Sequence, residues 1–167
     1  MRGIAPIASG LLVTLLAACS STVVDPGTPA GLGTDYVQGA VYLLLHDRYL
    51  DTPQGWPRPP FVIVASPHSY PYGASPRSMD DYRSNPGGWP KIRGILPAGT
   101  RIRLDRIERH RYPGLETWYT ATGTIESGEF RGVEVNLAFI SATVPGSRMH
   151  RVNPQELKRA EQPASDG

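Results

Sequence analysis

Cysteine is nearly absent from this chain, since Cys19 is the only one among the 167 residues. A single thiol cannot close a disulfide within the chain or build a zinc site from several thiolates. If Cys19 itself carries a covalent modification, no thiol remains for nucleophilic catalysis either. The shortage of cysteine therefore excludes several classes of enzyme and metal protein.

The chain also lacks an excess of charge of either sign. It has 17 lysines and arginines against 15 aspartates and glutamates, which leaves a formal net charge of +2. A protein that binds a polyanion usually presents a much stronger positive field. We therefore expect no nucleic-acid partner.

Familiar catalytic and metal-binding motifs are missing as well. None of the serines stands in a G-x-S-x-G or S-x-x-K motif, so serine hydrolysis has no support in the sequence. The histidines are far apart and show no H-E-x-x-H spacing, so we expect neither a bound metal nor a cofactor. The four are His46, His68, His110 and His150.

The N-terminal apolar run is too short to cross a membrane. Arg2 precedes an apolar stretch from Ile4 to Ala18, whereas a spanning helix needs roughly 20 such residues. A positive end, a short apolar run and small residues at its close are the three parts of a secretory signal. We therefore predict that residues 1–18 are a signal peptide.

The end of this run, Leu16-Ala17-Ala18-Cys19, resembles the lipobox of bacterial lipoproteins. The resemblance implies that the signal is cut just before Cys19 and that Cys19 is acylated on its sulfur and on its new amino group. Several acyl chains make a durable anchor in a lipid bilayer. By the sorting rule of that family, Ser20 at the next position implies export to the outer membrane, on its periplasmic side.

Composition divides the rest of the chain into three parts. Residues 19–38 contain the lipidated cysteine and a polar stretch rich in glycine and proline, which predicts a flexible tether with a reach of roughly 24 Å. Residues 39–145 are predicted to form one β domain. In the tail, residues 146–167, the pattern Asn153-Pro154-Gln155-Glu156 is typical of a helix start, so we expect a short C-terminal helix to about Glu161.

A fold rich in strands follows from 18 glycines and 17 prolines, which suit short strands joined by turns. The apolar run at 40–45 predicts a strand that is buried on both faces, and the run at 61–65 predicts a second, short apolar strand rich in β-branched residues. Alternating runs predict antiparallel strands, the clearest at 133–139, and Ile107 is out of phase with Ile102, which predicts a β-bulge near Asp105. The other strands are expected at 91–96, 100–108 and 118–125.

Two stretches resemble bacterial SH3-like barrels. Ile95-Leu96-Pro97-Ala98-Gly99-Thr100-Arg101-Ile102-Arg103-Leu104 is similar to the opening strand of such domains, and Glu126-Ser127-Gly128-Glu129-Phe130-Arg131-Gly132-Val133 to a later hairpin. The resemblance implies an all-β fold, a small antiparallel SH3-like barrel of five to seven strands. It also implies binding of a peptide or a cell-wall fragment without chemistry.

Residues 53–90 contain the best candidate for a binding surface, because two loops rich in proline also carry many aromatic rings. Rigid rings can stack on sugars or hold proline-rich peptides, and an arginine can fix polar groups. The alternative is that the rings cover a sheet too small to bury its own core. The candidate binding residues are Trp56, Tyr70, Tyr72, Tyr82, Arg83 and Trp89.

These observations predict a non-enzymatic lipoprotein that binds an envelope protein or peptidoglycan. One alternative is a small cell-wall or lipid hydrolase, in which His46 is a general base oriented by Asp47, with Asp51 close by. The structural interpretation of the same three residues is a polar cluster that ends a strand and satisfies a turn. Another alternative is an immunity or inhibitor lipoprotein that plugs an enzyme with the tyrosine-rich loop.

Overall fold

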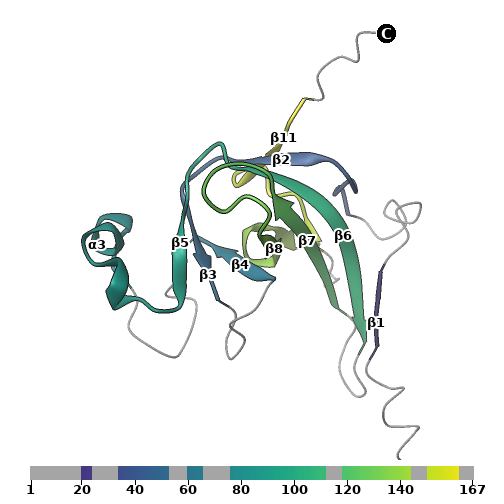
Figure 1. Cartoon of the computed structure of the whole chain (residues 1–167). Helices are drawn as coiled ribbons and strands as arrows, with labels where there is room; N and C mark the ends of the chain where they lie inside the picture. Colours follow the sequence, from purple (N-terminus) through teal and green to yellow (C-terminus); the bar gives the residue numbers. More distant parts are fainter. Residues whose placement is uncertain are drawn as a thin grey trace, which may run out of the picture.

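The computed structural model describes residues 20–23, 34–52, 60–65, 76–111, 118–143 and 150–161. One strongly curled sheet forms half a barrel, with α3 set to one side of it (Figure 1). Eight strands follow the order β11-β2-β6-β7-β8-β4-β3-β5, β1 joins the sheet by pairing with β6, and β9 and β10 form a separate pair. The elements are β1 (Ser20–Val23), β2 (Val41–Leu44), β3 (Arg48–Asp51), β4 (Phe61–Val64), α3 (Met79–Ser84), η2 (Pro86–Gly88), β5 (Ile92–Leu96), β6 (Arg101–Arg111), β7 (Trp118–Ile125), β8 (Glu134–Asn136), η3 (Ala138–Ile140), β9 (Ala142–Thr143), β10 (His150–Arg151) and β11 (Leu157–Arg159).

The predominance of strands is confirmed, whereas the closed antiparallel barrel of five to seven strands is wrong. β4 and β8 run parallel, with Phe61 opposite Val135, so the sheet is mixed. Among the residues that the structure describes, the path of the sheet ends at β11 and β5 and does not close on itself. The physical reason is that β3 and β4, which precede the stretch with the SH3-like resemblance, lie between β8 and β5 and widen the sheet.

The longest hairpin, β6–β7, has the irregularity that the sequence predicts. Leu104 lies opposite Gly123 and Arg106 lies opposite Thr122, so Asp105 is an extra residue on β6. This bulge returns Ile107 to the buried face after Ile102 and Leu104. An added residue reverses the inward and outward alternation of a strand, which explains why Ile107 is out of phase in the sequence.

The concave side of the sheet holds the larger of two apolar clusters, which we call the inner cluster. Leu50 from β3, Ile63 from β4, and Ile102 and Leu104 from β6 are fully buried in it. Leu157 from the tail is buried in the same cluster. The inner cluster thus joins strands from the whole length of the domain.

The opposite face of β3 and β4 carries the smaller cluster, called here the outer cluster. Tyr49, Val62, Val64, Tyr82 and Ile92 are buried in it, and Met79, Trp89 and Ile95 pack against it. β4 is therefore buried on both faces, which is consistent with its unbroken apolar sequence, whereas the double burial is predicted for 40–45. β2 is not buried on both faces, because its residues alternate between buried and half-buried, and Leu45 beyond its end is exposed.

The strand predicted at 133–139 is shorter than expected. β8 ends at Asn136, whose side-chain Oδ1 accepts a hydrogen bond from the Ala138 N–H at 2.8 Å. Such a local bond offers the backbone an alternative to strand pairing, and η3 follows. As a result Phe139 is 51% exposed and Ile140 takes the buried position instead.

The short C-terminal helix is another prediction that the structure overturns. Asn153 does begin a turn, since its Oδ1 accepts the Gln155 N–H and its carbonyl accepts the Leu157 N–H. The chain then extends into β11, which pairs with β2. Burial of Leu157 favours the strand over the helix, and Glu156 is held by two hydrogen bonds of 2.6 Å from Arg48.

The predicted tether also contains folded residues. Tyr36 is only 1% exposed, and its hydroxyl shares a 2.7 Å hydrogen bond with Ser141. The Tyr42 hydroxyl accepts the Val37 N–H at 2.9 Å. The domain therefore begins before residue 38, and β1, which directly follows Cys19, adds a further strand. Cys19 and the predicted signal peptide lie outside the described residues.

Candidate functional site

A cleft of about 320 Å³ lies where α3 and three turns meet at one end of the sheet. Its lining combines apolar residues, which we call the floor, with charged residues, which we call the rim. These residues come from α3, from the end of β5 and from the turns at 45–47, 97–100 and 126–133. This volume is at the small end of the range for ligand pockets, about 300–1,000 Å³. The lining residues are Asp47, Arg83, Ile95, Leu96, Pro97, Thr100, Ser127, Gly128, Glu129 and Phe130.

Asp47 fixes the relative positions of two walls of this cleft. One carboxylate oxygen accepts a 3.0 Å hydrogen bond from Arg83 Nη2, and the other accepts the Ala98 N–H at 2.9 Å. Arg83 also donates to Asp80 at 3.0 Å within α3. One carboxylate thus joins α3 to the 97–100 turn, and the Arg83 guanidinium stays about half exposed at the rim.

The third wall is the β7–β8 turn, which places Phe130 on the backbone of β5. A Cβ atom at position 94 would overlap the Phe130 ring, so Gly94 lets the ring approach this strand closely. The Ser127 hydroxyl accepts the Arg101 N–H at 2.9 Å and ties the same turn to the start of β6. The ring and the hydroxyl together hold the apolar floor of the cleft in place.

Helix α3 positions Arg83 through a capped start and a buried anchor. Ser78 is the N-cap, and its hydroxyl accepts the Asp81 N–H at 3.1 Å. Asp81 in turn accepts the Arg77 N–H at 2.8 Å. Tyr82 packs edge-on against Tyr49, with ring centroids 6.0 Å apart. The Ser78-to-Asp81 spacing is the sequence signal for this helix within residues 66–90.

Of the predicted binding residues that the structure describes, two pack against the sheet and one lines the cleft. Tyr82 is only 8% exposed, and its burial raises the pKa of its hydroxyl. Trp89 is half-buried against the outer cluster. Both rings therefore cover the sheet, as the alternative interpretation predicts, and Arg83 alone of the described candidates lines the cleft. Trp56, Tyr70 and Tyr72 lie outside the described residues.

The proposed base and its orienting carboxylate are not assembled. Both oxygens of Asp47 are bonded to Arg83 and Ala98 rather than to His46, which is exposed. Asp51 lies on the outer face of β3, opposite Val62. A hydrolase that relies on His46 and Asp47 therefore has no support in this geometry, and the polar cluster at a strand end describes these residues better.

Two polar atoms are buried in or beside the outer cluster without a hydrogen-bond partner. They are Oδ1 of Asp51 and Nε1 of Trp89. Asp51 is 3% exposed, and burial raises the pKa of its carboxyl, opposed by the Thr52 N–H and by Lys91. A buried polar atom without a partner costs free energy. Among the described residues a third such atom, Nδ1 of His150, lies on β10, so two of the three adjoin the outer cluster.

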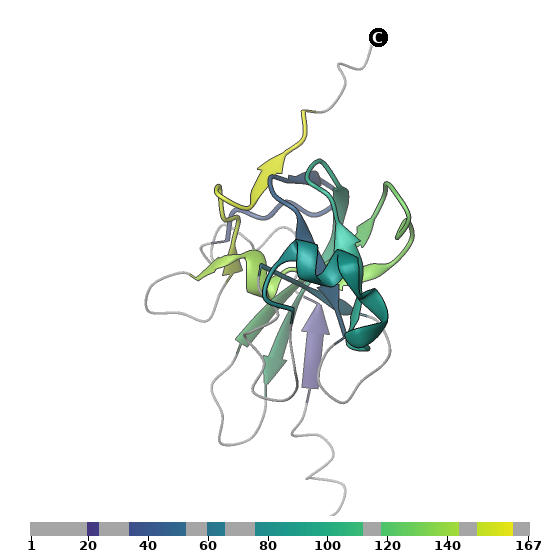
Figure 2. The same ribbon diagram turned by 90° about the vertical axis from the view of Figure 1, so that its left-hand side faces the viewer.

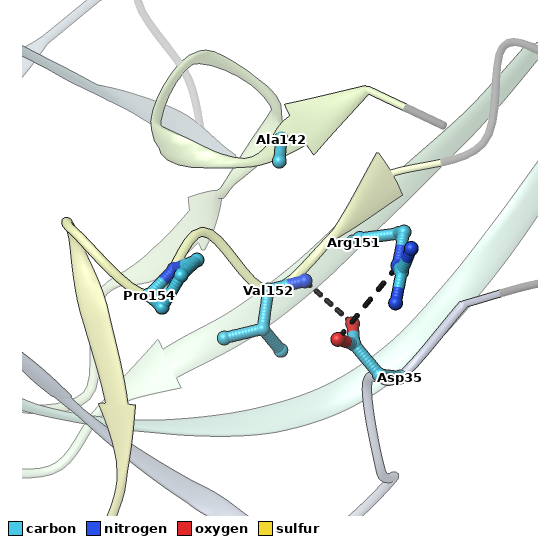
Figure 3. Close-up of a pocket in the computed structure, with 5 residues that line it drawn as sticks. All are labelled: Asp35, Ala142, Arg151, Val152 and Pro154. Carbon is cyan, nitrogen blue, oxygen red and sulfur yellow. Dashed lines mark hydrogen bonds and ion pairs between the residues drawn. The ribbon is translucent and has the colours of Figure 1, made fainter. Parts of the chain in front are cut away.

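A second hollow, of about 380 Å³, lies at the tail and is lined by Ala142, Pro154 and three residues that bond to one another (Figure 3). Asp35 Oδ1 accepts the Val152 N–H at 2.6 Å, and its other oxygen is 3.8 Å from Arg151 Nε. The one carboxylate in the lining is therefore engaged. Its evident role is to hold the start of the domain against the tail.

Comparison with protein-family models, with curated proteins and with solved structures finds no match for this chain.

Proposed function

We propose that this chain is a non-enzymatic lipoprotein of the bacterial outer membrane, facing the periplasm, and that its cleft binds an extended segment of another envelope protein. The anchor rests on Leu16-Ala17-Ala18-Cys19 after a short apolar run. The binding mode rests on a single observation, which is that the cleft lies against β5, the last strand of the sheet path.

An edge strand can accept one more strand. In the part of the chain that the structure describes, β5 pairs with β3 on one side and with no strand on the other. An extended peptide that adds to such an edge gains main-chain hydrogen bonds, while pockets for alternate side chains provide the specificity. The cleft beside Ile95 and Leu96 can supply one such pocket.

The lining indicates what the bound segment looks like. Ile95 and Phe130, which are both half-buried, offer apolar surface, which suits one large apolar side chain. Arg83 and Asp47 stand at one side of the rim and Glu129 at another, so polar or charged residues on either side of that apolar residue can find partners. Because Tyr82 and Trp89 pack against the sheet, stacking on a sugar ring is less well supported than a polypeptide.

The binding test compares Arg83→Glu with Arg77→Glu, an exposed arginine just before α3. The first substitution removes a rim cation and places a negative charge beside Asp47, so we expect recovery of the cross-linked envelope partner to fall at least fivefold. Arg77→Glu should recover as much as the wild type. Equal recovery by both variants, or retention on purified peptidoglycan alone, would count against a protein partner in this cleft.

The anchor has a separate test. Substitution Cys19→Ser removes the acylation site, so we expect a soluble or uncleaved protein. The measurement is the mass of the mature N-terminal peptide together with its distribution between membrane and soluble fractions. Membrane association that persists in the Cys19→Ser variant would show that the anchor is elsewhere.

A further inference from the structure

The long strand β6 has two different neighbours along one edge. β2 pairs with its first residues, Arg101 to Arg103, and β1 pairs with its last, from Glu108 to Arg111. In the second pairing Ser20 lies opposite Arg111 (Figure 1). Because Ser20 directly follows Cys19 in the sequence, the predicted acylation site is one peptide bond from the strand that pairs with the far end of β6.

That end of β6 carries three consecutive basic residue types, Arg109, His110 and Arg111. The Arg109 side chain is exposed. The nearest acid along the strand, Glu108, is 3.4 Å from Arg106 Nε and is thus already paired. A basic residue that lies within a Debye length of an anionic membrane surface raises the affinity of the protein for that membrane about fivefold.

We infer that the far end of β6 faces the bilayer, that the exposed Arg109 adjoins anionic lipid head groups, and that the cleft points away from the membrane. This rests on the proposed acylation of Cys19. Ten steps along β6 separate Arg111 from Arg101, which follows the cleft residue Thr100. At a strand rise of about 3.3 Å per residue, the cleft is held about 30 Å from the anchored end.

The arrangement differs from a free tether in a way that can be measured. A flexible chain after Cys19 would let the domain tumble. The cleft and the far end of β6 would then approach the head groups equally often. Pairing of β1 with β6 instead fixes one end near the lipid. Figure 1 shows β1 beside the end of β6 that is remote from β2 and from the cleft turns.

The experiment uses the lipidated full chain in vesicles of phosphatidylglycerol and phosphatidylcholine. Since Cys19 is the only cysteine, an introduced thiol can be labelled uniquely with a fluorophore, either through Arg109→Cys or through Ala98→Cys at the cleft turn. We expect a head-group quencher to reduce the signal at 109 at least fivefold more than at 98. Equal quenching, or stronger quenching at 98, would overturn the inference.

A second pair of variants tests whether β1 causes the orientation. Ser21→Pro and Thr22→Pro are compared in the Arg109→Cys background, because the N–H of only one of two neighbouring residues points toward β6 and proline removes it. At least one should bring quenching at 109 down to the level at 98, whereas Thr28→Pro, beyond β1, should not. Unchanged quenching in both β1 variants contradicts the inference.

Two further outcomes separate the parts of the proposal. In vesicles of phosphatidylcholine alone, quenching at 109 should be weaker, and equal quenching in both compositions would contradict the head-group contact. If the wild-type chain does not bind vesicles at all, the proposed anchor fails and the inference with it. Binding with equal quenching at both positions overturns only the orientation.

Discussion

The two apolar clusters on either side of β3 and β4 differ in how completely the polar atoms buried beside them are hydrogen-bonded. The inner cluster is apolar, gathers residues from strands throughout the domain, and buries Leu50, Ile63 and Leu104 fully. The outer cluster has fewer members, and it lies beside the unpaired Asp51 Oδ1 and Trp89 Nε1. Figure 2 shows α3 standing in front of the sheet rather than within it.

The inner cluster stabilises the curled sheet, whereas the outer cluster positions the charged side of the cleft. The inner cluster fixes the curled sheet and therefore β5, whose free edge and end form part of the cleft. The outer cluster only attaches residues 76–90, yet through Tyr82 it sets the position of Arg83. We therefore expect the cleft to open locally before the sheet unfolds. The reason is that Arg83 depends on the outer cluster, beside which two buried polar atoms lack hydrogen-bond partners.

The largest effect should come from Leu50→Ala. This side chain is fully buried in the inner cluster between β4 and β5, so its truncation leaves a cavity and should cost about 4 kcal/mol. Urea unfolding checks the value, and hydrogen exchange should accelerate in β3, β6 and β7 alike. A loss below about 1 kcal/mol would show that the inner cluster does not organise the sheet.

Tyr82→Ala should have a smaller and more local effect. Loss of the ring removes the contact with Tyr49 and should cost about 3 kcal/mol at most. We expect hydrogen exchange to increase over residues 76–90 while β6 and β7 remain protected, and partner recovery to fall as it does for Arg83→Glu. Uniform loss of protection across the sheet would show that the two clusters are one cooperative unit.

Gly94→Ala tests the floor of the cleft. The added methyl overlaps the Phe130 ring, which must move, and such overpacking costs about 1–3 kcal/mol. We expect partner recovery to decrease several-fold, and the double variant Gly94→Ala with Phe130→Ala to regain stability relative to the sum of the two single changes. Simple additivity of the unfolding free energies would mean that Phe130 does not pack on Gly94.

The smallest effect is expected from Asp51→Asn, and it should depend on pH. Burial raises the pKa of Asp51 above its ordinary value of 3.8. The folded protein therefore binds this proton more tightly than the unfolded chain, so stability falls as pH rises from the unfolded pKa through the folded one. Asparagine avoids the buried charge and should stabilise the protein by about 1 kcal/mol near neutral pH.

The measurement for Asp51→Asn is urea unfolding of both proteins near pH 3 and near pH 7. The difference between them should be close to zero at the lower pH, where the wild-type carboxyl is protonated in both states. A stabilisation of equal size at both pH values would mean that the charge of Asp51 is not responsible.

Sequence patterns predict the local structure of this chain better than its topology. The extra residue near Asp105 can be read directly from the alternation of apolar and polar residues, and the strand at 61–64 from its apolar run. The strand in the tail could not be predicted from the sequence, because Asn153 begins a turn that suits a helix. Only the burial of Leu157 in the inner cluster, which is built from distant parts of the chain, favours the strand. Tyr36 presents the same difficulty, since its local sequence is that of a linker.

The candidate site shows the same limit. Arg83 could be named from the sequence, but tertiary structure brings its partner Asp47 to it, and Asp47 in turn accepts the Ala98 N–H. Tyr82 and Trp89 are candidates for a binding surface in the sequence, yet both pack against the outer cluster, because an aromatic residue in a proline-rich segment fits a core as well as a binding surface. The positive φ angles of Gly99 and Gly128 mark turns on two sides of the cleft, but they do not indicate that the turns meet.

The most direct test of binding at the open sheet edge compares the two ends of the sheet path in intact cells. A photo-crosslinking residue is placed at Ile95, half-buried on β5 in the cleft lining, or at Lys158, exposed on β11. We expect position 95 to yield a protein adduct of discrete mass that disappears when Arg83→Glu is added, and position 158 to yield none. Equal adducts from both positions, or an adduct at 95 that Arg83→Glu leaves unchanged, would contradict binding in the cleft.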